Sequence, residues 1–147
     1  MFVTGPPGEA DGRLKVIDFG TASKFNNLIM FQEMYGTATF MAPEVINKYY
    51  REKCDVWSLG IITYLLLSLR LPFIDKNDVD ILAQVKSDPV MFASAKKSRS
   101  ILSVDLIKKM LIKDQNARIS AVSMINHPWL SKYAHDEFLK KQVHATL

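Results

Sequence analysis

Apolar residues recur at helical spacing over most of the chain after residue 50, whereas the earlier residues show only one short strand-like run. Residues 56–69 are uncharged and apolar on every side, which predicts a helix that other helices must enclose, with Asp55 as its N-cap. Residues 75–87 carry apolar side chains at near-helical spacing and predict a second helix.

Serine residues mark the predicted starts of two further helices. Ser103 is a natural N-cap, with Asp105 in the first turn and Lys108 and Lys109 near the end, an order of charges that suits the helix dipole. The apolar stripe of this helix consists of Leu106, Ile107, Met110 and Leu111. Ser120 caps the next predicted helix, which the following proline ends because the residue before a proline avoids helical geometry.

The two ends of the chain predict shorter elements. Residues 14–19 are rich in Val, Ile and Phe and predict a strand, and the pair Asp11-Gly12 before it is a favoured hairpin turn. Residues 21–36 show no sustained period and predict a long loop. Residues 131–147 predict an amphipathic tail helix. The expected architecture is therefore one bundle of helices with a short N-terminal β-hairpin.

The composition is that of one globular domain, with 48% hydrophobic and 23% charged residues among 147. Cys54 is the single cysteine, which excludes an internal disulfide and makes the cytoplasm the expected location, with the nucleus as the alternative. The net charge of +4 comes from short clusters typical of solvated helix faces, so nucleic acid is not an expected partner. A membrane span is not expected either, because residues 56–69 are fewer than the roughly 20 apolar residues that a bilayer requires.

Asp18, Phe19 and Gly20 follow the predicted strand and indicate a candidate metal ligand. A carboxylate at the end of a strand, followed by a glycine that can adopt unusual backbone angles, can hold an oxygen ligand toward Mg²⁺ and phosphate oxygens. Taken alone, these three residues are explained more simply by a strand that ends in a turn.

Five further motifs follow in order: GTATFMAPE at residues 36–44, CDVWSLG at 54–60, LPF at 71–73, NARIS at 116–120 and NHPW at 126–129. In this order and spacing the chain resembles the large helical lobe of a eukaryotic protein kinase, from its Asp-Phe-Gly motif to the end of the domain. The resemblance implies a protein-kinase-like α+β fold of which this chain is a C-lobe fragment. The implied divisions are a partial kinase domain over residues 1–130, with the activation segment at 18–44 and the helical C-lobe at 45–130.

The resemblance assigns roles to residues of the activation segment. Asp18 is similar to the carboxylate that binds the Mg²⁺ bridging the ATP phosphates, and Phe19 to the apolar plug whose packing sets the active state. Thr37 matches a threonine that helps hold the catalytic aspartate and shapes the substrate pocket. Glu33 stands where an activating phosphorylation usually occurs, and its fixed carboxylate is expected to imitate the phosphate in part. The pattern around Thr37 is similar to that of serine/threonine kinases, which use ATP and Mg²⁺.

Two structural roles are also implied. Glu44 and Arg118 match a buried ion pair that ties the activation segment to the helices below it, although two such residues are more often unrelated surface charges when met without the motifs. Asp55 resembles the aspartate that braces the catalytic loop, and a plain helix cap is compatible with that role.

The stretch EKCDVWSLGIITYLLLS, the HPWL ending and Glu33 resemble the calcium-dependent and calmodulin-dependent kinase group, with Leu69 and Leu71 departing from its usual Gly and Pro. The resemblance implies protein substrates and a calcium-sensing segment or calmodulin as partners. Residues 75–86 do not supply the ligands of a calcium-binding EF-hand loop, and His127, His135, His144 and Cys54 do not stand at a zinc-binding spacing.

No Gly-rich loop, strand lysine or His-Arg-Asp catalytic loop occurs in the 147 residues. Residues 1–3 resemble the strand that follows the catalytic asparagine, so the chain is expected to begin just past it, with the catalytic Asp, Asn and Lys upstream of Met1. We therefore expect a portion of a serine/threonine protein kinase that is inactive by itself, lacks its N-lobe partner and exposes apolar surface that limits its solubility. The alternative is a non-catalytic, pseudokinase-like protein-binding module.

Overall fold

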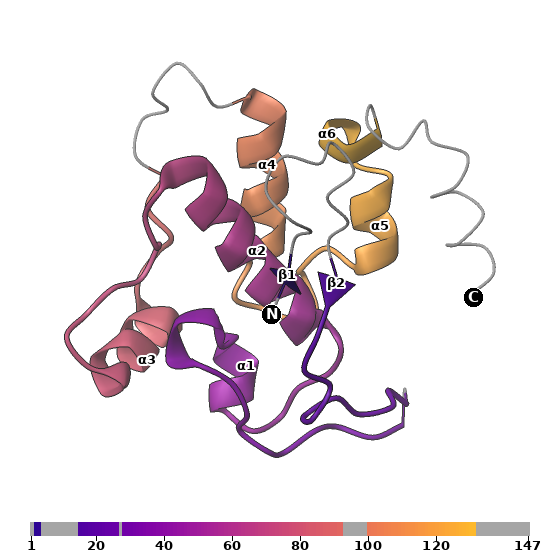
Figure 1. Cartoon of the computed structure of the whole chain (residues 1–147), viewed down its shortest axis with the longest axis vertical. Coiled ribbons are helices and arrows are strands. Elements are labelled where there is room, and N and C mark those ends of the chain that lie inside the picture. The colour runs from indigo at the N-terminus through magenta and orange to yellow at the C-terminus, as the bar shows by residue number, and fades with distance from the viewer. Residues whose placement is uncertain (1, 4–14, 27, 93–99, 132–147) are drawn as a thin grey trace.

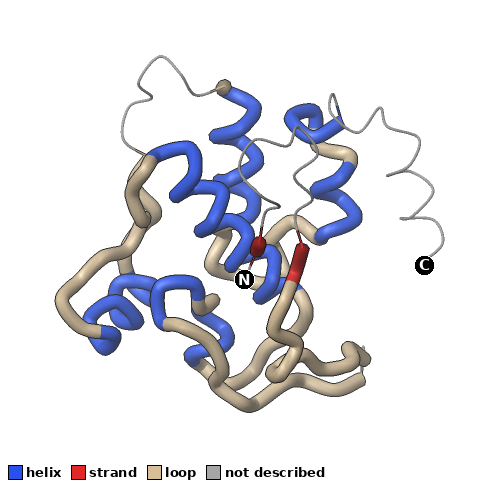
Figure 2. The backbone as a smooth tube through the Cα atoms, in the orientation of Figure 1, coloured by secondary structure: helices blue, strands red, loops and turns tan. Residues whose placement is uncertain are grey.

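The computed structural model describes residues 2–3, 15–26, 28–92 and 100–131, and this part of the chain is mainly helical (Figures 1 and 2). Its elements are β1 (Phe2–Val3), β2 (Lys15–Val16), the 3-10 helix η1 (Ala38–Phe40), α1 (Pro43–Ile46), α2 (Lys53–Ser68), α3 (Asp78–Ser87), α4 (Ile101–Met110), α5 (Ala121–Ile125) and α6 (Pro128–Ser131). The prediction of a mainly helical fold is confirmed. None of the helices in these ranges is both long and apolar enough to cross a bilayer.

Helix α2 is the centre of the molecule and packs beside α4 and against η1 (Figure 1). Trp57 and Ile61 of α2 are completely buried in the main core. Gly60 allows the close approach of the next layer, because a Cβ atom at this position would stand 2.8 Å from Cδ2 of Leu111 and 3.0 Å from Cβ of Met110. The predicted apolar stripe of α4 is buried against this surface.

Two predicted N-caps are wrong. Helix α2 begins at Lys53, so Asp55 lies inside its first turn rather than before it. Helix α4 is capped by Ser100, whose Oγ accepts the N–H of Leu102 at 3.2 Å. Ser103 lies within this helix, buried, and its hydroxyl donates to the carbonyl of Ser100 at 2.7 Å. For α4, Ser100 offers the same sequence signal as Ser103, whereas Glu52, the residue before α2, makes no side-chain cap bond.

The earlier start of α4 also moves Asp105 out of the first turn, where it was expected. Asp105 lies in the middle of the helix and forms an ion pair with Lys109 one turn later, at 2.7 Å. The basic residues Lys108 and Lys109 lie in the last turn, as predicted.

Local side-chain caps set the starts of two other helices. Ser120 caps α5, since its Oγ accepts the N–H of Ser123 at 3.1 Å. Helix α3 begins at Asp78, three residues later than expected, because the side chain of Asn77 accepts the N–H of Asp80 at 2.9 Å and so caps the helix there. Pro128 does not itself end α5, which stops at Ile125, but occupies the first position of α6.

Strands β1 and β2 pair antiparallel, with Phe2 opposite Val16 and Val3 opposite Lys15. Strand β2 is shorter than the predicted residues 14–19. The connection between the strands, with the expected turn at residues 11–12, lies outside the described residues, so the hairpin stays a prediction. The same holds for the tail helix beyond Ser131.

Candidate functional site

The Asp-Phe-Gly motif lies just after β2, where the chain leaves the strand pair. Asp18 adopts a left-handed backbone conformation (φ 69°), whereas Gly20, expected to hold the unusual angles, does not have a positive φ. Aspartate tolerates this conformation better than most residues. A Cβ at position 20 would stand 3.6 Å from Oδ1 of Asp18, an ordinary contact.

The carboxylate of Asp18 is exposed, and within the described residues no hydrogen bond or salt bridge engages it. A free, hard oxygen ligand fits Mg²⁺, which usually takes one or two protein carboxylates and completes its shell with phosphate and water oxygens. The described residues contain no group of three or more Asp, Glu, His or Cys arranged to hold a metal ion. Asp18 could supply one oxygen ligand, and its role in a Mg²⁺ site stays a prediction.

Phe19 is 68% exposed, so the described residues do not form the pocket expected for this side chain. The segment after the Asp-Phe-Gly motif is anchored by an isolated β-bridge between Phe31 and Tyr50. The N–H of Phe31 donates to the carbonyl of Tyr50 at 2.9 Å, and the N–H of Tyr50 donates to the carbonyl of Phe31 at 3.2 Å. The two rings lie 5.5 Å apart and reinforce this anchor.

Glu33 and Thr37 are both exposed. The Glu33 carboxylate accepts the N–H of Gln32 at 3.3 Å, and no Lys or Arg in the described part of the chain forms a salt bridge with it. Gly36 adopts φ 123°, a conformation that a side chain would strain, and it turns the chain into η1 directly after Thr37. These two predicted site residues are thus available to groups outside the described chain.

The structure brings Glu44 and Arg118 together in a buried ion pair across 74 positions of sequence. Glu44 is 6% exposed and Arg118 is 1% exposed. Both carboxylate oxygens accept from the guanidinium: Oε1 from Nη1, and Oε2 from Nη2 at 2.8 Å. This two-point geometry is available to arginine because its donors form a planar fork.

The remaining donors of Arg118 bind main-chain carbonyls. Nε donates to Ile112 at 2.8 Å, Nη1 to Lys53 at 2.8 Å and Nη2 to Lys113 at 3.2 Å. With the two bonds to Glu44, every one of the five guanidinium N–H groups has an acceptor. Helix α1, the start of α2 and the loop after α4 therefore meet at one side chain.

An aromatic stack packs against the guanidinium of Arg118. The guanidinium carbon of Arg118 lies 5.1 Å from the ring centre of Trp57. Trp57 in turn stacks on Phe73, with ring centres 6.2 Å apart and planes inclined by 8°. A cation over a desolvated indole face is favourable, so the stack stabilises the charge that burial would otherwise penalise.

Asp55 is exposed in the first turn of α2, and its Oδ1 accepts a weak bond from the Cys54 thiol at 3.8 Å. Partial desolvation raises the pKa of the Asp55 carboxyl, while the contact with Cys54 acts in the opposite direction. Burial, followed by the nearby charge of Asp55, raises the pKa of the Cys54 thiol to about 12. The role of Asp55 as a brace for a catalytic loop stays a prediction.

Two residues that hold this region together were missed by the sequence reasoning. Ser58 donates to the carbonyl of Phe40 at 2.9 Å and so ties α2 to the end of η1. Lys53 donates to two carbonyls in the loop that contains Arg118. Ser58 lies inside a motif that could have drawn attention to it, whereas a lysine at the start of a helix looks like a solvated charge.

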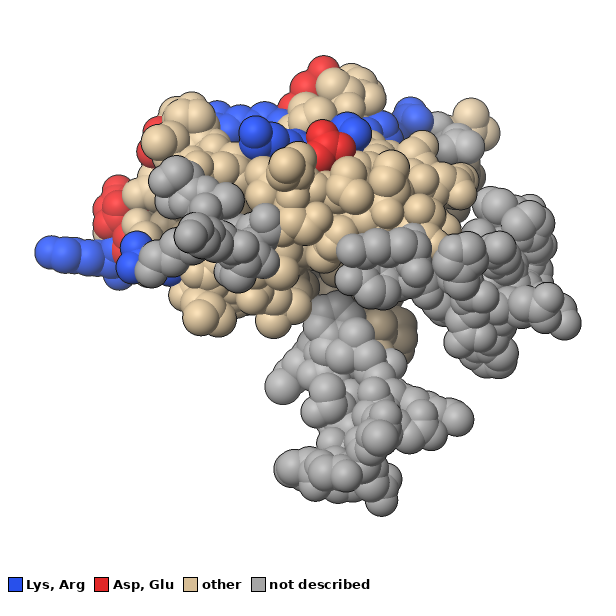
Figure 3. All heavy atoms as spheres, turned by 90° about the horizontal axis from the view of Figure 1, so that it is seen from above, with Lys and Arg blue, Asp and Glu red and all other residues tan. Residues whose placement is uncertain are grey.

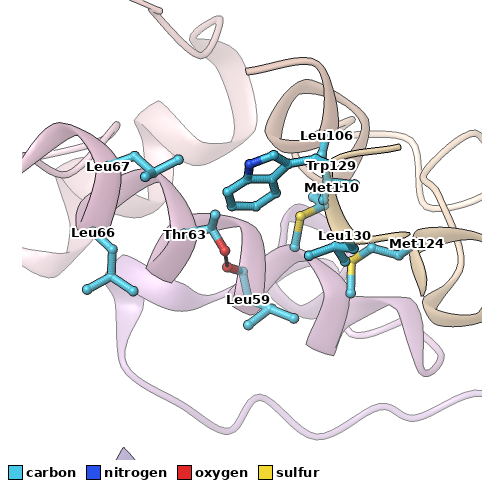
Figure 4. A pocket seen from close by; sticks show the side chains of 9 residues that line it. All are labelled: Leu59, Thr63, Leu66, Leu67, Leu106, Met110, Met124, Trp129 and Leu130. Carbon is cyan, nitrogen blue, oxygen red and sulfur yellow. Dashed lines mark hydrogen bonds between the residues drawn. The ribbon is translucent and has the colours of Figure 1, made fainter. Parts of the chain in front are cut away.

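An apolar groove runs between α2 and the pair α5–α6 (Figure 4). It is lined by Leu59, Thr63, Leu66, Leu67, Leu106, Met110, Met124, Trp129 and Leu130. Leu66 is 71% exposed. The prediction that neighbouring helices enclose α2 on every side is therefore wrong for this face within the described residues, and the expected bare apolar surface lies here.

His127 beside this groove has a structural role. It is buried, and its Nδ1 accepts the N–H of Trp129 at 3.2 Å, so the proton resides on Nε2, which lies 2.8 Å from Oδ2 of Asp105. Hydrogen bonds from Lys109 and then from His127 lower the pKa of Asp105.

The charged side chains are mixed on the surface of the molecule. Lys and Arg lie along one edge with acidic residues between them, as Figure 3 shows, and this mixture is typical of solvated faces.

Residues 8–130 match the family described as protein kinase domain. The chain belongs to this family. It is 41% identical over 118 residues to calcium-dependent protein kinase 4 of Plasmodium falciparum (isolate 3D7), covering 80% of this chain and 22% of that protein. It is 38% identical over 123 residues to myosin light chain kinase 2, skeletal/cardiac muscle, of Bos taurus, covering 82% of this chain and 20% of that protein.

The same kinase of Homo sapiens is 37% identical over 123 residues. The resemblance to calcium-dependent kinases stated from the motifs is confirmed by these matches. The chain spans about a fifth of the length of the curated relatives that it matches, at 22% and 20%.

Proposed function

We propose that this chain is the rear part of a serine/threonine protein kinase that transfers the γ-phosphate of ATP to Ser or Thr of protein substrates. In this proposal the chain supplies the Mg²⁺ ligand Asp18, the activation segment over residues 18–44 and the helical lobe that supports it. By itself it lacks a catalytic loop and is inactive.

The observation that carries the proposal is the buried pair of Glu44 and Arg118. A buried ion pair contributes little net stability compared with apolar packing, so its presence favours a role in fixing one conformation. Here the conformation fixed is that of the segment leading from Thr37 to α1, which the family uses to dock protein substrates. The match of residues 8–130 to the kinase family supports the same interpretation.

Asp18 would hold Mg²⁺ in the complete kinase, and the metal when bound neutralises charge on the phosphates of ATP. Support comes from the carboxylate of Asp18, which is exposed, belongs to a residue with a left-handed backbone conformation, and forms no salt bridge with a cation of the described chain. Phosphoryl transfer further requires a base that orients the substrate hydroxyl, and we assign that group to a catalytic loop outside these 147 residues.

The partners follow from the same proposal. The N-lobe and catalytic loop complete the enzyme, protein hydroxyls are its substrates, and a calcium-sensing segment or calmodulin regulates it. The apolar groove beside α2 is then covered by the remainder of the kinase domain, which removes the exposed leucines from water. The cytoplasm or nucleus is its place of action, in agreement with the single free cysteine.

The test is a phosphotransfer assay on the longer in-frame protein with Asp18→Asn. We expect activity to fall at least a hundredfold, because the amide is a much weaker ligand for Mg²⁺ than the carboxylate. Asp75→Asn is the matched control, because Asp75 is also exposed but accepts a bond from Nε2 of Gln84 at 2.8 Å and lies far from Asp18 in the sequence. This variant should keep full activity. An Asp18→Asn enzyme as active as the wild type would overturn the proposal.

The groove favours a second candidate, a non-catalytic protein-binding module. If the 147-residue chain is the whole native product, an amphipathic helix of a partner protein would occupy this surface. A native chain that carries no upstream catalytic loop and co-purifies with such a partner in stoichiometric amount would favour the module over the enzyme.

A further inference from the structure

Lys53, the first residue of α2, is held by an unusual set of bonds. Its Nζ donates to the carbonyl of Arg118 at 2.7 Å and to the carbonyl of Asn116 at 3.1 Å. In return, the Lys53 carbonyl accepts from Nη1 of Arg118 at 2.8 Å. Each of the two residues thus binds the main chain of the other with its side chain, and we refer to this reciprocal arrangement of Lys53 and Arg118 as the clasp.

The clasp joins two segments that are 65 positions apart. A second link lies close by, because Nε2 of Gln115 donates to the carbonyl of Tyr49 at 3.1 Å. Both segments contribute to a small polar hollow lined by Arg51, Glu52, Lys53, Gln115 and Asn116. Within the described residues Lys53 forms no salt bridge with a carboxylate, so carbonyl dipoles alone receive its ammonium group. Such bonds require a fixed geometry, whereas a surface ion pair does not.

The position of the clasp connects two elements of the proposed kinase. On one side, Arg118 holds Glu44 and therefore the end of the activation segment. On the other side, Asp55 lies in the first turn of α2, two residues after Lys53. Any shift between the start of α2 and the loop at 114–118 would move these two elements relative to each other.

We propose that Lys53 is a positioning residue that fixes the substrate-docking segment, residues 37–44, through the clasp with Arg118. The proposal rests on the kinase function proposed above and names a residue that acts through Arg118 and Glu44 without touching ATP or substrate. Its loss loosens residues 37–44 while the nucleotide-binding groups stay in place.

Three variants separate this role from a general effect of losing a lysine. Lys53→Met keeps the length and the apolar stem of the side chain but removes both donors. Lys53→Arg keeps a cation with several N–H donors at the end of a long side chain and should retain the wild-type behaviour. Lys109→Met is the matched control, because it removes a lysine that pairs with Asp105 on an exposed face at 2.7 Å.

The first measurement is amide hydrogen exchange of the 147-residue chain, read over residues 37–50 and 112–120. Two lost hydrogen bonds of ordinary strength predict exchange about tenfold faster in both segments for Lys53→Met. Lys53→Arg should stay within about twofold of the wild type, as should Lys109→Met. Unchanged exchange in Lys53→Met, or equal acceleration in Lys109→Met, would overturn the clasp.

The second measurement is steady-state kinetics of the longer in-frame protein. Lys53→Met should raise KM for the protein substrate about tenfold and leave KM for ATP and kcat within about twofold, since only substrate docking is affected. A purely structural defect would instead lower kcat by reducing the folded fraction, which would refute the positioning role. A wild type without kinase activity would refute the proposed function, and the exchange result would then decide the clasp on its own.

Discussion

Replacing Glu44 by Gln tests the buried ion pair with a change of almost no volume. The variant leaves the guanidinium of Arg118 buried and charged, with three carbonyl acceptors still in place. The new amide can accept one bond, but its NH₂ group faces N–H donors of Arg118 and repels them. Removing one partner of such a pair costs about 3–5 kcal/mol.

Urea unfolding of the chain in dilute solution, followed by the fluorescence of its two tryptophans, of which Trp57 is completely buried, measures this cost. With a slope of about 2 kcal/mol/M, a loss of 4 kcal/mol lowers the urea midpoint by about 2 M. This is a large share of the roughly 5–15 kcal/mol that stabilises an ordinary domain, so a variant unfolded without urea is also consistent with the reasoning. Glu33→Gln is the control, because Glu33 is exposed and its loss should change stability by less than about 0.5 kcal/mol.

A double variant makes the test sharper. Glu44→Gln combined with Arg118→Met removes both charges, so no unpaired charge remains and the loss should be clearly smaller than the sum of the two single losses. A midpoint shift below about 0.5 M for Glu44→Gln alone, or strict additivity in the double variant, would show that Glu44 and Arg118 do not form a strongly coupled buried ion pair.

Four further changes have defined outcomes. Leu69→Gly should raise the free energy of unfolding by up to about 1 kcal/mol, because Leu69 is 86% exposed and holds a left-handed φ of 55° that glycine adopts without strain; a lower urea midpoint would count against this. Gly60→Ala should destabilise by about 1–3 kcal/mol, since its Cβ would stand 2.8 Å from Leu111, and wild-type stability would contradict the packing. Cys54 should react with iodoacetamide at pH 8 about a thousandfold more slowly in the folded than in the unfolded chain. The reason is that only the thiolate reacts, and the pKa of the folded thiol, about 12, lies three units above the ordinary 9.0. Labelling of the folded chain at the unfolded rate would show an exposed thiol. Glu33→Lys in the complete kinase should lower activity at least tenfold by reversing the charge that imitates a phosphate, and unchanged activity would remove that role.

Motifs predicted the candidate site better than periodicity predicted the elements. Glu44 and Arg118 are 74 positions apart, and only the resemblance to kinases suggested that they meet. The start of α2 was missed because Glu52, the residue before it, makes no side-chain cap bond, whereas Lys53, the first helical residue, bonds two carbonyls of a distant loop. Tertiary bonds of this kind have no signature in local sequence.

The side-chain bonds to carbonyls were the least predictable part of the site. Ser58 and Lys53 donate to main-chain carbonyl oxygens, which every residue carries. The residue types in the sequence therefore do not indicate which residue accepts each bond. The groove was expected in outline from the apolar character of residues 56–69, but its position on the Leu59 and Leu66 face required the packing of α5 and α6.

The central claim is that the chain works as the rear part of a complete kinase, and the mass of the native polypeptide tests it most directly. An antibody against residues 131–147 should detect, in extracts of the source cells, a product far heavier than the 16.7 kDa of this chain. A sole product at 16.7 kDa would contradict the claim, because the cell would then make a helical lobe without a catalytic base.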